Sequence, residues 1–211
     1  MSITTEPVGV PLLQACSLVS SNDKVPSPWV QTVLSDVSRA LEFMHKSSIY
    51  HRDVNPKNVI VVTTKTGPQA ILIDYGIAFK VQYTGGGSKG EASRSSGFFG
   101  TVNYAHRKLF EYYPGRAYDP EAKHDWAGLG LTMAVLVNGC KLPWNPIVDF
   151  HVTIKDPKDE KISLLREVMD ERYNSAYEAV LHMDGVAGSK QEENWRKVRN
   201  EILGLLDKDK T

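Results

Sequence analysis

The sequence has no net charge and very little cysteine. Lysine plus arginine equals aspartate plus glutamate at 25 each, so no global basic field exists to hold nucleic acid or an anionic membrane. Partners must therefore be recognised locally. The two cysteines, Cys16 and Cys140, are too few for a disulfide framework. We expect both to be reduced, partly buried thiols in a cytoplasmic protein.

Long apolar runs and internal repeats are missing as well. The longest apolar stretch, residues 129–137, is far too short to span a bilayer, and the first residues carry no signal-peptide pattern. No fixed-period repeat occurs, which excludes solenoids and propellers. With 211 residues, 41% of them hydrophobic, the chain is the size of one ordinary globular domain.

Periodicity predicts a mainly helical protein with one small β-hairpin. Ser27-Pro28 precedes an apolar stripe that fits a helix of about 18 residues, and a buried helix is expected from Asp125 to residue 137. Two amphipathic helices are expected around residues 162–168 and 195–205. The β-rich runs 59–62 and 70–73 flank Lys65-Thr66-Gly67-Pro68 and indicate a hairpin.

An ordered set of polar motifs carries the chemistry. His51-Arg52-Asp53 is followed by Asn58, five residues after the aspartate, and by Asp74-Tyr75-Gly76 beyond the hairpin. Gly100-Thr101-Val102-Asn103-Tyr104 has the form Gly-Thr-x-x-Tyr, and residues 125–130 match Asp-x-Trp-Ser-Leu-Gly at their ends and at Leu129. In this order and spacing, the set resembles the catalytic lobe of the Ser/Thr protein kinases.

The resemblance implies a kinase-like fold and the use of ATP and Mg²⁺. Asp53 would accept the proton of the substrate hydroxyl, while Asn58 and Asp74 would hold Mg²⁺. Ile60 would lie under the adenine ring, and Thr101 would reach towards Asp53.

The segment between Asp74-Tyr75-Gly76 and the Gly-Thr motif is a candidate for regulation. Residues 84–97 contain five glycines and four serines, so we expect a mobile loop there. Arg52 would meet a phosphate on this loop, and the candidate phosphorylation sites are Ser88, Ser93, Ser95 and Ser96. The equal alternative is a glycine-serine linker without phosphorylation.

Three positions depart from the family pattern. Asn55 stands where most Ser/Thr kinases have a lysine, so one contact to the γ-phosphate is missing. Lys57 is the candidate to supply that cation, with a solvated loop lysine as the alternative. His106-Arg107-Lys108 replaces Ala-Pro-Glu and removes the glutamate of a buried ion pair, so we expect a loosely held activation segment.

The family's glycine-rich phosphate loop is also missing. No Gly-x-Gly-x-x-Gly occurs before His51, and only about 26 residues precede the Ser27 helix. We therefore expect a C-lobe without the N-terminal β-lobe. Residues 1–26 would be a remnant of the interlobe linker with the first C-lobe helix, residues 27–145 the catalytic core, and residues 146–211 a divergent helical part.

Three functions remain open at this stage. The first is phosphoryl transfer from ATP to a protein Ser/Thr hydroxyl by a truncated kinase chain. The second is an inactive lobe, a pseudokinase, that binds a kinase or its substrate or self-associates through the uncovered interlobe face. A small-molecule kinase of the aminoglycoside-phosphotransferase type ranks last, because a long activation segment is unusual there. We assign no role to His45, His124, His151 and His182.

Overall fold

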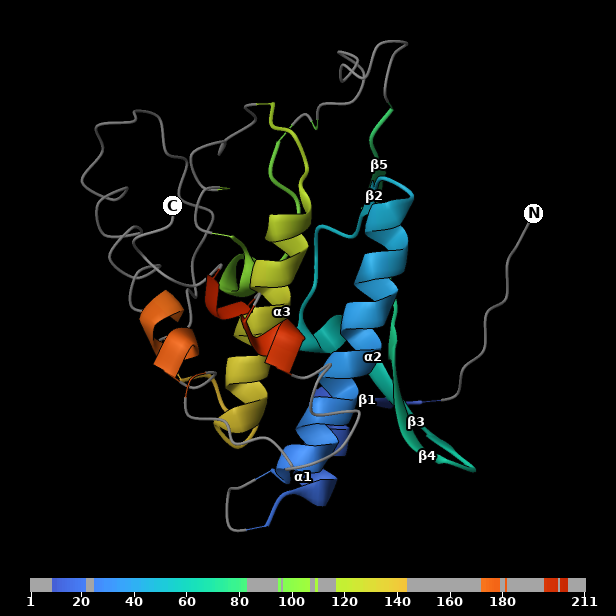
Figure 1. Cartoon of the computed structure of the whole chain (residues 1–211), viewed down its shortest axis with the longest axis vertical. Helices are drawn as coiled ribbons and strands as arrows, with labels where there is room; N and C mark the ends of the chain where they lie inside the picture. The colour runs from blue at the N-terminus through green and yellow to red at the C-terminus, as the bar shows by residue number, and fades with distance from the viewer. Residues whose placement is uncertain are drawn as a thin grey trace.

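The structure is a computed structural model, and it describes residues 9–21, 25–82, 95, 97–106, 109, 117–143, 172–178, 181, 196–200 and 202–204. The elements are, in chain order, β1 (Val10–Pro11), α1 (Leu12–Val19), α2 (Ser27–Lys46), β2 (Ile49–Tyr50), η1 (Pro56–Asn58), β3 (Val59–Thr64), β4 (Gly67–Leu72), β5 (Phe79–Lys80), η3 (Val102–Tyr104) and α3 (Ala122–Val137). The fold is thus rich in helix, with small antiparallel sheets (Figure 1).

Helix α2 is the predicted amphipathic helix. Pro28 lies in its first turn, where a missing N–H costs nothing, and the helix ends at Lys46. Its buried side consists of Val30, Val33, Leu34, Val37, Leu41 and Met44, which the sequence pattern places on one face. This face packs against both α3 and β4 (Figure 1).

Helix α3 is the predicted core helix, and it begins three residues before Asp125. Glu121 caps it, and His124 completes a reciprocal capping box in which His124 Nδ1 accepts the Glu121 N–H at 3.1 Å. Every residue from His124 to Leu136 is buried. Its apolar surface on all sides explains why it lies in the centre of the protein.

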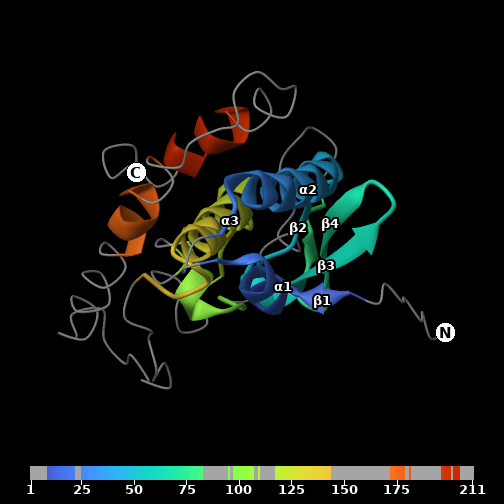
Figure 2. The ribbon, with the colours of Figure 1, turned by 90° about the horizontal axis from the view of Figure 1, so that it is seen from below.

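The predicted hairpin is confirmed as β3 and β4, with Val61 opposite Ala70. The structure adds β1, which pairs antiparallel to β3 through Val10 and Pro11. Helix α1 follows β1 directly and lies beside β1 and β3, at the edge of the sheet opposite β4 (Figure 2). Two-residue strands such as β1 carry no periodic signal, so the sequence did not reveal this one.

The outer edge of β4 is covered by a side chain of α2. Asp36 Oδ2 accepts the Ala70 N–H at 2.9 Å. Because N–H directions alternate along a strand, the nitrogen of Pro68 lies on the same outer side, where proline has no hydrogen to donate. The hairpin is therefore anchored to α2 by its edge as well as by its buried face.

A second sheet consists of β2 and β5, in which Ile49 lies opposite Lys80 and Tyr50 opposite Phe79. The segments just before His51 and just after Gly76 thereby lie side by side. This pairing brings the two chemical loops of the sequence together.

The expectation of two reduced cysteines is wrong. Cys16 and Cys140 form a disulfide that joins α1 to the turn after α3, with their Cα atoms 6.3 Å apart. The two residues are 124 positions apart, so only the packing of α1 near the end of α3 makes the bond possible. Two cysteines without a spacing pattern gave no signal for this in the sequence.

The C-terminal part is described in pieces. Residues 172–178, 196–200 and 202–204 are helical, and Val198 and Ile202 are buried, as the stripe predicted for this region requires. The expected helix at 162–168, the expected mobile loop up to residue 94, and Trp195 lie outside the described residues. Among the helices that are described, none combines the length and apolar character needed to cross a bilayer.

Candidate active site

Asp53 is held by two N–H donors from two different segments. Its Oδ1 accepts the backbone N–H of Thr101 at 2.7 Å, and its Oδ2 accepts Asn58 Nδ2 at 2.8 Å. The same Asn58 amide also donates to the Asp53 carbonyl at 2.9 Å. The carboxylate is therefore fixed in orientation while each oxygen keeps a lone pair for a further donor.

Asn55, which stands in place of the family's lysine, is buried and bonded within the loop. Its Nδ2 donates to the Asp53 carbonyl at 3.1 Å and to Thr101 Oγ1 at 3.2 Å, and its Oδ1 accepts the Lys57 N–H at 2.8 Å. Thr101 thus contacts Asp53 through its backbone, while its hydroxyl contacts Asn55. Lys57 is exposed, and its side chain forms no ion pair within the described part of the chain.

Residues 51–58, called the catalytic loop from here on, are held by a buried carboxylate in α3. Asp125 is 1% exposed; its Oδ1 accepts the Arg52 N–H at 2.7 Å and its Oδ2 the His51 N–H at 2.8 Å. In the sequence, Asp125 stands out only as the start of a motif. Its spacing of 73 and 74 residues from these partners gives no local signal for the contact.

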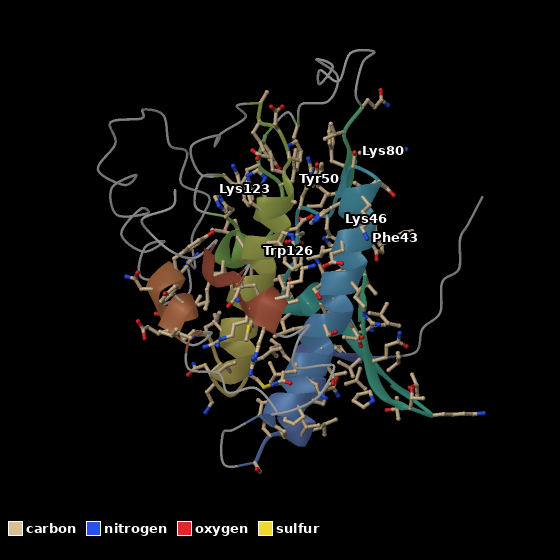
Figure 3. The ribbon with its side chains drawn as sticks, in the orientation of Figure 1. Phe43, Lys46, Tyr50, Lys80, Lys123 and Trp126 are labelled. Carbon is tan, nitrogen blue, oxygen red and sulfur yellow. A yellow bond between two sulfur atoms is a disulfide. The ribbon has the colours of Figure 1, made fainter. Side chains whose placement is uncertain are left out.

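His45, to which the sequence analysis gave no role, is a third partner of this carboxylate. His45 Nε2 lies 2.8 Å from Asp125 Oδ2, and since a carboxylate only accepts, His45 Nε2 carries the hydrogen. The His45 ring packs between Tyr50 and Trp126, with centroid distances of 5.5 and 6.3 Å. Figure 3 shows Tyr50 between the upper parts of α2 and α3, and Trp126 on α3.

His51 joins the catalytic loop to the strand that carries Asp74. Its Nε2 lies 3.0 Å from the Ile73 carbonyl, and its Nδ1 lies 3.3 Å from the Asp53 nitrogen. A carbonyl only accepts and a backbone nitrogen only donates, so these contacts require the neutral tautomer with hydrogen on Nε2. His51 is fully buried. A neutral ring with both nitrogens hydrogen-bonded can be buried without the cost of desolvating a charge.

Asn58 and Asp74 lie close to each other, because Ile73 donates its N–H to the Asn58 carbonyl at 2.9 Å. Asp74 is exposed and has a positive φ of 64°, and its Oδ1 accepts the Gly76 N–H at 3.3 Å. Since Asn58 donates with Nδ2 to Asp53, its Oδ1 is left to face another partner. Mg²⁺ prefers oxygen ligands such as carboxylate and amide oxygens, so the side chains of Asp74 and Asn58 suit this ion chemically.

Arg52 faces the activation segment. Its Nε donates to the Ile77 carbonyl at 2.7 Å and its Nη1 to Ser95 Oγ at 2.6 Å. The guanidinium carbon also lies 5.5 Å from the ring centre of Phe79 and 5.1 Å from that of Phe99. Of the candidate phosphorylation sites, Ser95 is thus placed beside Arg52, and the other three lie outside the described residues.

Gly100 lets the activation segment approach the catalytic loop closely. Its φ is +126°, and a Cβ at this position would lie 2.6 Å from the Arg52 carbonyl oxygen. Any side chain would therefore push Thr101 away from Asp53. The glycine of the Gly-Thr motif has a steric role in bringing these two segments together.

Arg172 anchors the end of the Gly-Thr motif from the C-terminal part of the chain, and the sequence analysis missed it. It is fully buried, and its guanidinium donates to the Val102 carbonyl at 3.3 Å and to Asn103 Oδ1 at 2.9 Å. Burial raises the pKa of the adjacent Tyr104 to about 12, against the opposing effect of the Arg172 charge. His106 is buried nearby, whereas residues 107 and 108 lie outside the described residues.

Ile60 lies on β3 opposite Pro11 of β1 and Ile71 of β4. It is half-buried, and a Cβ on Gly9 would lie 3.0 Å from Ile60 Cδ1. The segment before α1 thus passes directly over Ile60.

The helix-rich fold with small antiparallel sheets is compatible with the family that the chain matches. The protein kinase domain matches residues 9–206, and the chain belongs to this family. The family match therefore includes the C-terminal part, for which the sequence motifs gave no argument.

Individual relatives are Ser/Thr protein kinases. Serine/threonine-protein kinase PknI of Mycobacterium tuberculosis (strain ATCC 25618 / H37Rv) is 38% identical over 60 residues, 28% of this chain and 10% of the relative. Serine/threonine-protein kinase 32B of Homo sapiens is 28% identical over 137 residues, 65% of this chain and 29% of the relative. The chain thus matches less than a third of the length of either relative.

Proposed function

We propose that the chain is the catalytic C-lobe of a Ser/Thr-type protein kinase and transfers a phosphoryl group from ATP to a hydroxyl of a protein substrate. The observation that carries this proposal is the Asp53 carboxylate, held by Thr101 at 2.7 Å and by Asn58 at 2.8 Å. Such a fixed carboxylate is what a general base needs, because proton transfer depends on geometry first.

Asp53 accepts the proton of the attacking hydroxyl, and Thr101 keeps the base at the place where the substrate segment would pass. Asn58 Oδ1 and the Asp74 carboxylate hold Mg²⁺. The bound ion neutralises negative charge on the phosphates. Ile60 forms part of the apolar floor for the adenine ring, and exposed Lys57 supplies a positive charge towards the transferred phosphate.

The glycine-rich loop that binds the ATP phosphates in this family is separate from the motifs that contain Asp53, Asn58 and Asp74. The sequence has no Gly-x-Gly-x-x-Gly ahead of His51. We propose that efficient turnover requires such a loop, on the same polypeptide or on a partner kinase. One lost electrostatic contact to the transition state costs about 10²–10³ in rate, so without that loop turnover is slow.

A phosphoryl-transfer assay tests this function. The purified chain is mixed with Mg²⁺, γ-labelled ATP and a serine-containing protein substrate, and transfer is compared with that of Asp53→Asn. Loss of a general base lowers the rate by about 10²–10⁴-fold. The matched control is Glu42→Gln, another acid-to-amide change, at a position whose carboxylate lies 3.7 Å from exposed Lys197. Equal label transfer by Asp53→Asn and Glu42→Gln would reject the role of Asp53.

A second candidate function is an inactive lobe that binds a kinase or its substrate. Asn55 favours it, because both N–H groups of the side chain in the lysine position are bonded to Asp53 and Thr101, which leaves no donor there for a phosphate. Thermal unfolding with Mg²⁺ and ATP separates the two functions. A ligand at 100 times its dissociation constant adds about 2.7 kcal/mol of stability. No shift at millimolar Mg²⁺ and ATP would favour the binding function.

A further inference from the structure

Arg52 is surrounded by neutral groups. Two of its nitrogens donate to the Ile77 carbonyl and to Ser95 Oγ, and two aromatic rings lie within 5.5 Å of its guanidinium carbon. Among the described residues, no carboxylate forms an ion pair with it. The Arg52 guanidinium is therefore bound by dipoles and ring faces, while the Asp125 carboxylate accepts the backbone N–H of the same residue.

Ser95 is buried and hydrogen-bonded through both its backbone and its side chain. It is 2% exposed, its N–H donates to the Tyr118 carbonyl at 2.9 Å, and the Tyr118 N–H donates to its carbonyl at 3.1 Å. Its hydroxyl donates to the Gly97 carbonyl at 2.9 Å while accepting from Arg52. The donor of this hydroxyl and at least one of its two acceptor lone pairs are thus in use, and the Tyr118 side chain hydrogen-bonds the same hydroxyl. A modifying enzyme could not reach it without opening the bridge to Tyr118.

Phe99 connects this anchor to the base. Its ring lies 5.1 Å from the Arg52 guanidinium carbon, and the next two residues are Gly100, packed on the Arg52 carbonyl, and Thr101, which donates to Asp53. Phe99 is 44% exposed, so burial accounts for only part of its ring surface. A ring held half in water beside a guanidinium points to cation–π attraction as the reason for its position.

We propose that Phe99 is a positioning residue that holds residues 99–101 through Arg52, and that the Ser95 hydroxyl occupies the place of a loop phosphate. The segment beside Asp53 is then ordered without phosphorylation. The effect of Phe99 on catalysis rests on the proposed function, because Phe99 positions Thr101, which contacts the proposed base Asp53.

The competing arrangement is a phosphate elsewhere on the segment bound by Arg52. A two-point contact with a phosphate is the usual strong mode of arginine, and it would compete with the Ile77 carbonyl and Ser95 Oγ for the same donors. It would also require the segment to open at Ser95. The two arrangements therefore differ in what keeps Thr101 in place.

Amide hydrogen exchange at Thr101 tests the proposal. The whole chain is treated with phosphatase, its unphosphorylated state is verified by intact mass, and exchange is followed in residues 97–106. The proposal expects slow exchange at Thr101, about three- to tenfold faster exchange in Phe99→Leu, and wild-type exchange in Phe99→Tyr, which retains the ring face. Phe43→Leu is the matched control, because Phe43 is 75% exposed on the outer side of α2 (Figure 3).

Several outcomes would overturn the proposal. One is fast exchange at Thr101 in the unphosphorylated chain that becomes slow after phosphorylation. Another is equal exchange at Thr101 in Phe99→Leu, Phe99→Tyr and the wild type. If Phe99→Leu loosens the whole fold, the ratio of exchange at Thr101 to that at Leu131 in α3 isolates the local effect. Arg52→Lys, which keeps the charge without the planar group, is the second variant and is expected to behave like Phe99→Leu.

The same samples are assayed for phosphoryl transfer, which separates this inference from the proposed function. No transfer together with the expected exchange pattern contradicts the proposed function and leaves the role of Phe99 standing. Transfer that is equal in Phe99→Leu and Phe99→Tyr, with equal exchange, contradicts the role of Phe99 alone.

Discussion

Gly128 of α3 lies directly against the backbone of Val54 in the catalytic loop. A Cβ at Gly128 would stand 2.5 Å from the Val54 carbonyl oxygen, a distance that real Cβ contacts do not reach. The obstructing atom is backbone, so the loop itself would have to move. This contact and the hydrogen bonds to Asp125, one turn earlier in α3, together determine how closely the catalytic loop packs against α3.

Gly128→Ala is expected to destabilise the protein, although alanine in a helix is ordinarily favoured over glycine by about 1 kcal/mol. Displacing a packed backbone costs about 1–3 kcal/mol, so the normal sign is reversed. Urea unfolding measures the difference. Gly204→Ala is the control, because a Cβ there meets nothing within 4 Å. Equal stability of both alanine variants would contradict the close contact.

Asp125→Asn is expected to lower stability and loosen the catalytic loop. The amide replaces one accepting oxygen with an N–H₂ group, which then faces either the Arg52 N–H or the pair formed by the His51 N–H and His45 Nε2. A buried donor left without its acceptor costs about 1–3 kcal/mol. Urea unfolding and amide exchange at His51 and Arg52 measure this, with Glu42→Gln as control. Unchanged exchange at both amides would argue against the carboxylate as their anchor.

Removal of the disulfide is expected to lower the melting temperature. Cys16 and Cys140 are 124 residues apart, and a covalent link over a loop of that length stabilises by about 4–5 kcal/mol in the chain-entropy description. Cys140→Ser is the milder variant, because Cys16 is fully buried and Cys140 is partly exposed. Thermal unfolding with and without reductant checks it: reductant lowers the melting temperature of the wild type and leaves Cys140→Ser unchanged. A wild type that ignores reductant and matches Cys140→Ser would show that the link is not formed.

Alkaline pH is expected to destabilise the protein through Tyr104. Its pKa is raised from 10.0 to about 12 in the fold, chiefly by burial. Above pH 10 the unfolded chain releases this proton while the folded chain keeps it, so stability falls as the pH rises towards about 12. Burial also raises the pKa values of Tyr75 and Tyr118, which act in the same direction. Tyr104→Phe should show a shallower fall of unfolding free energy between these pH values, and an unchanged slope would exclude Tyr104 as its source.

The elements that the sequence predicted are those specified by local pattern. Helices α2 and α3 and the hairpin β3–β4 each follow from periodicity, a proline in the first turn or a turn sequence within a few residues. The roles of Asp53, Asn58 and Asp74 came instead from the resemblance to the protein kinases, and they stay predictions.

The features that the sequence did not reveal all depend on packing between distant segments. The Asp125 carboxylate meets His45 across 80 residues, and the disulfide joins residues 124 apart. Arg172 reaches Asn103 across 69 residues. In each case the residue type alone fits a surface position equally well, so only the folded chain shows that these side chains are buried and bonded.

The contact between Asp36 and Ala70 has a consequence for aggregation. Edge strands are where sheets of separate molecules join, because their outward N–H groups offer a template for another strand. On the outer edge of β4, the Ala70 N–H is already bonded to Asp36 and Pro68 has none to give. A second chain that approaches this edge finds no donor at two successive outward positions, which blocks growth of an intermolecular sheet from β4.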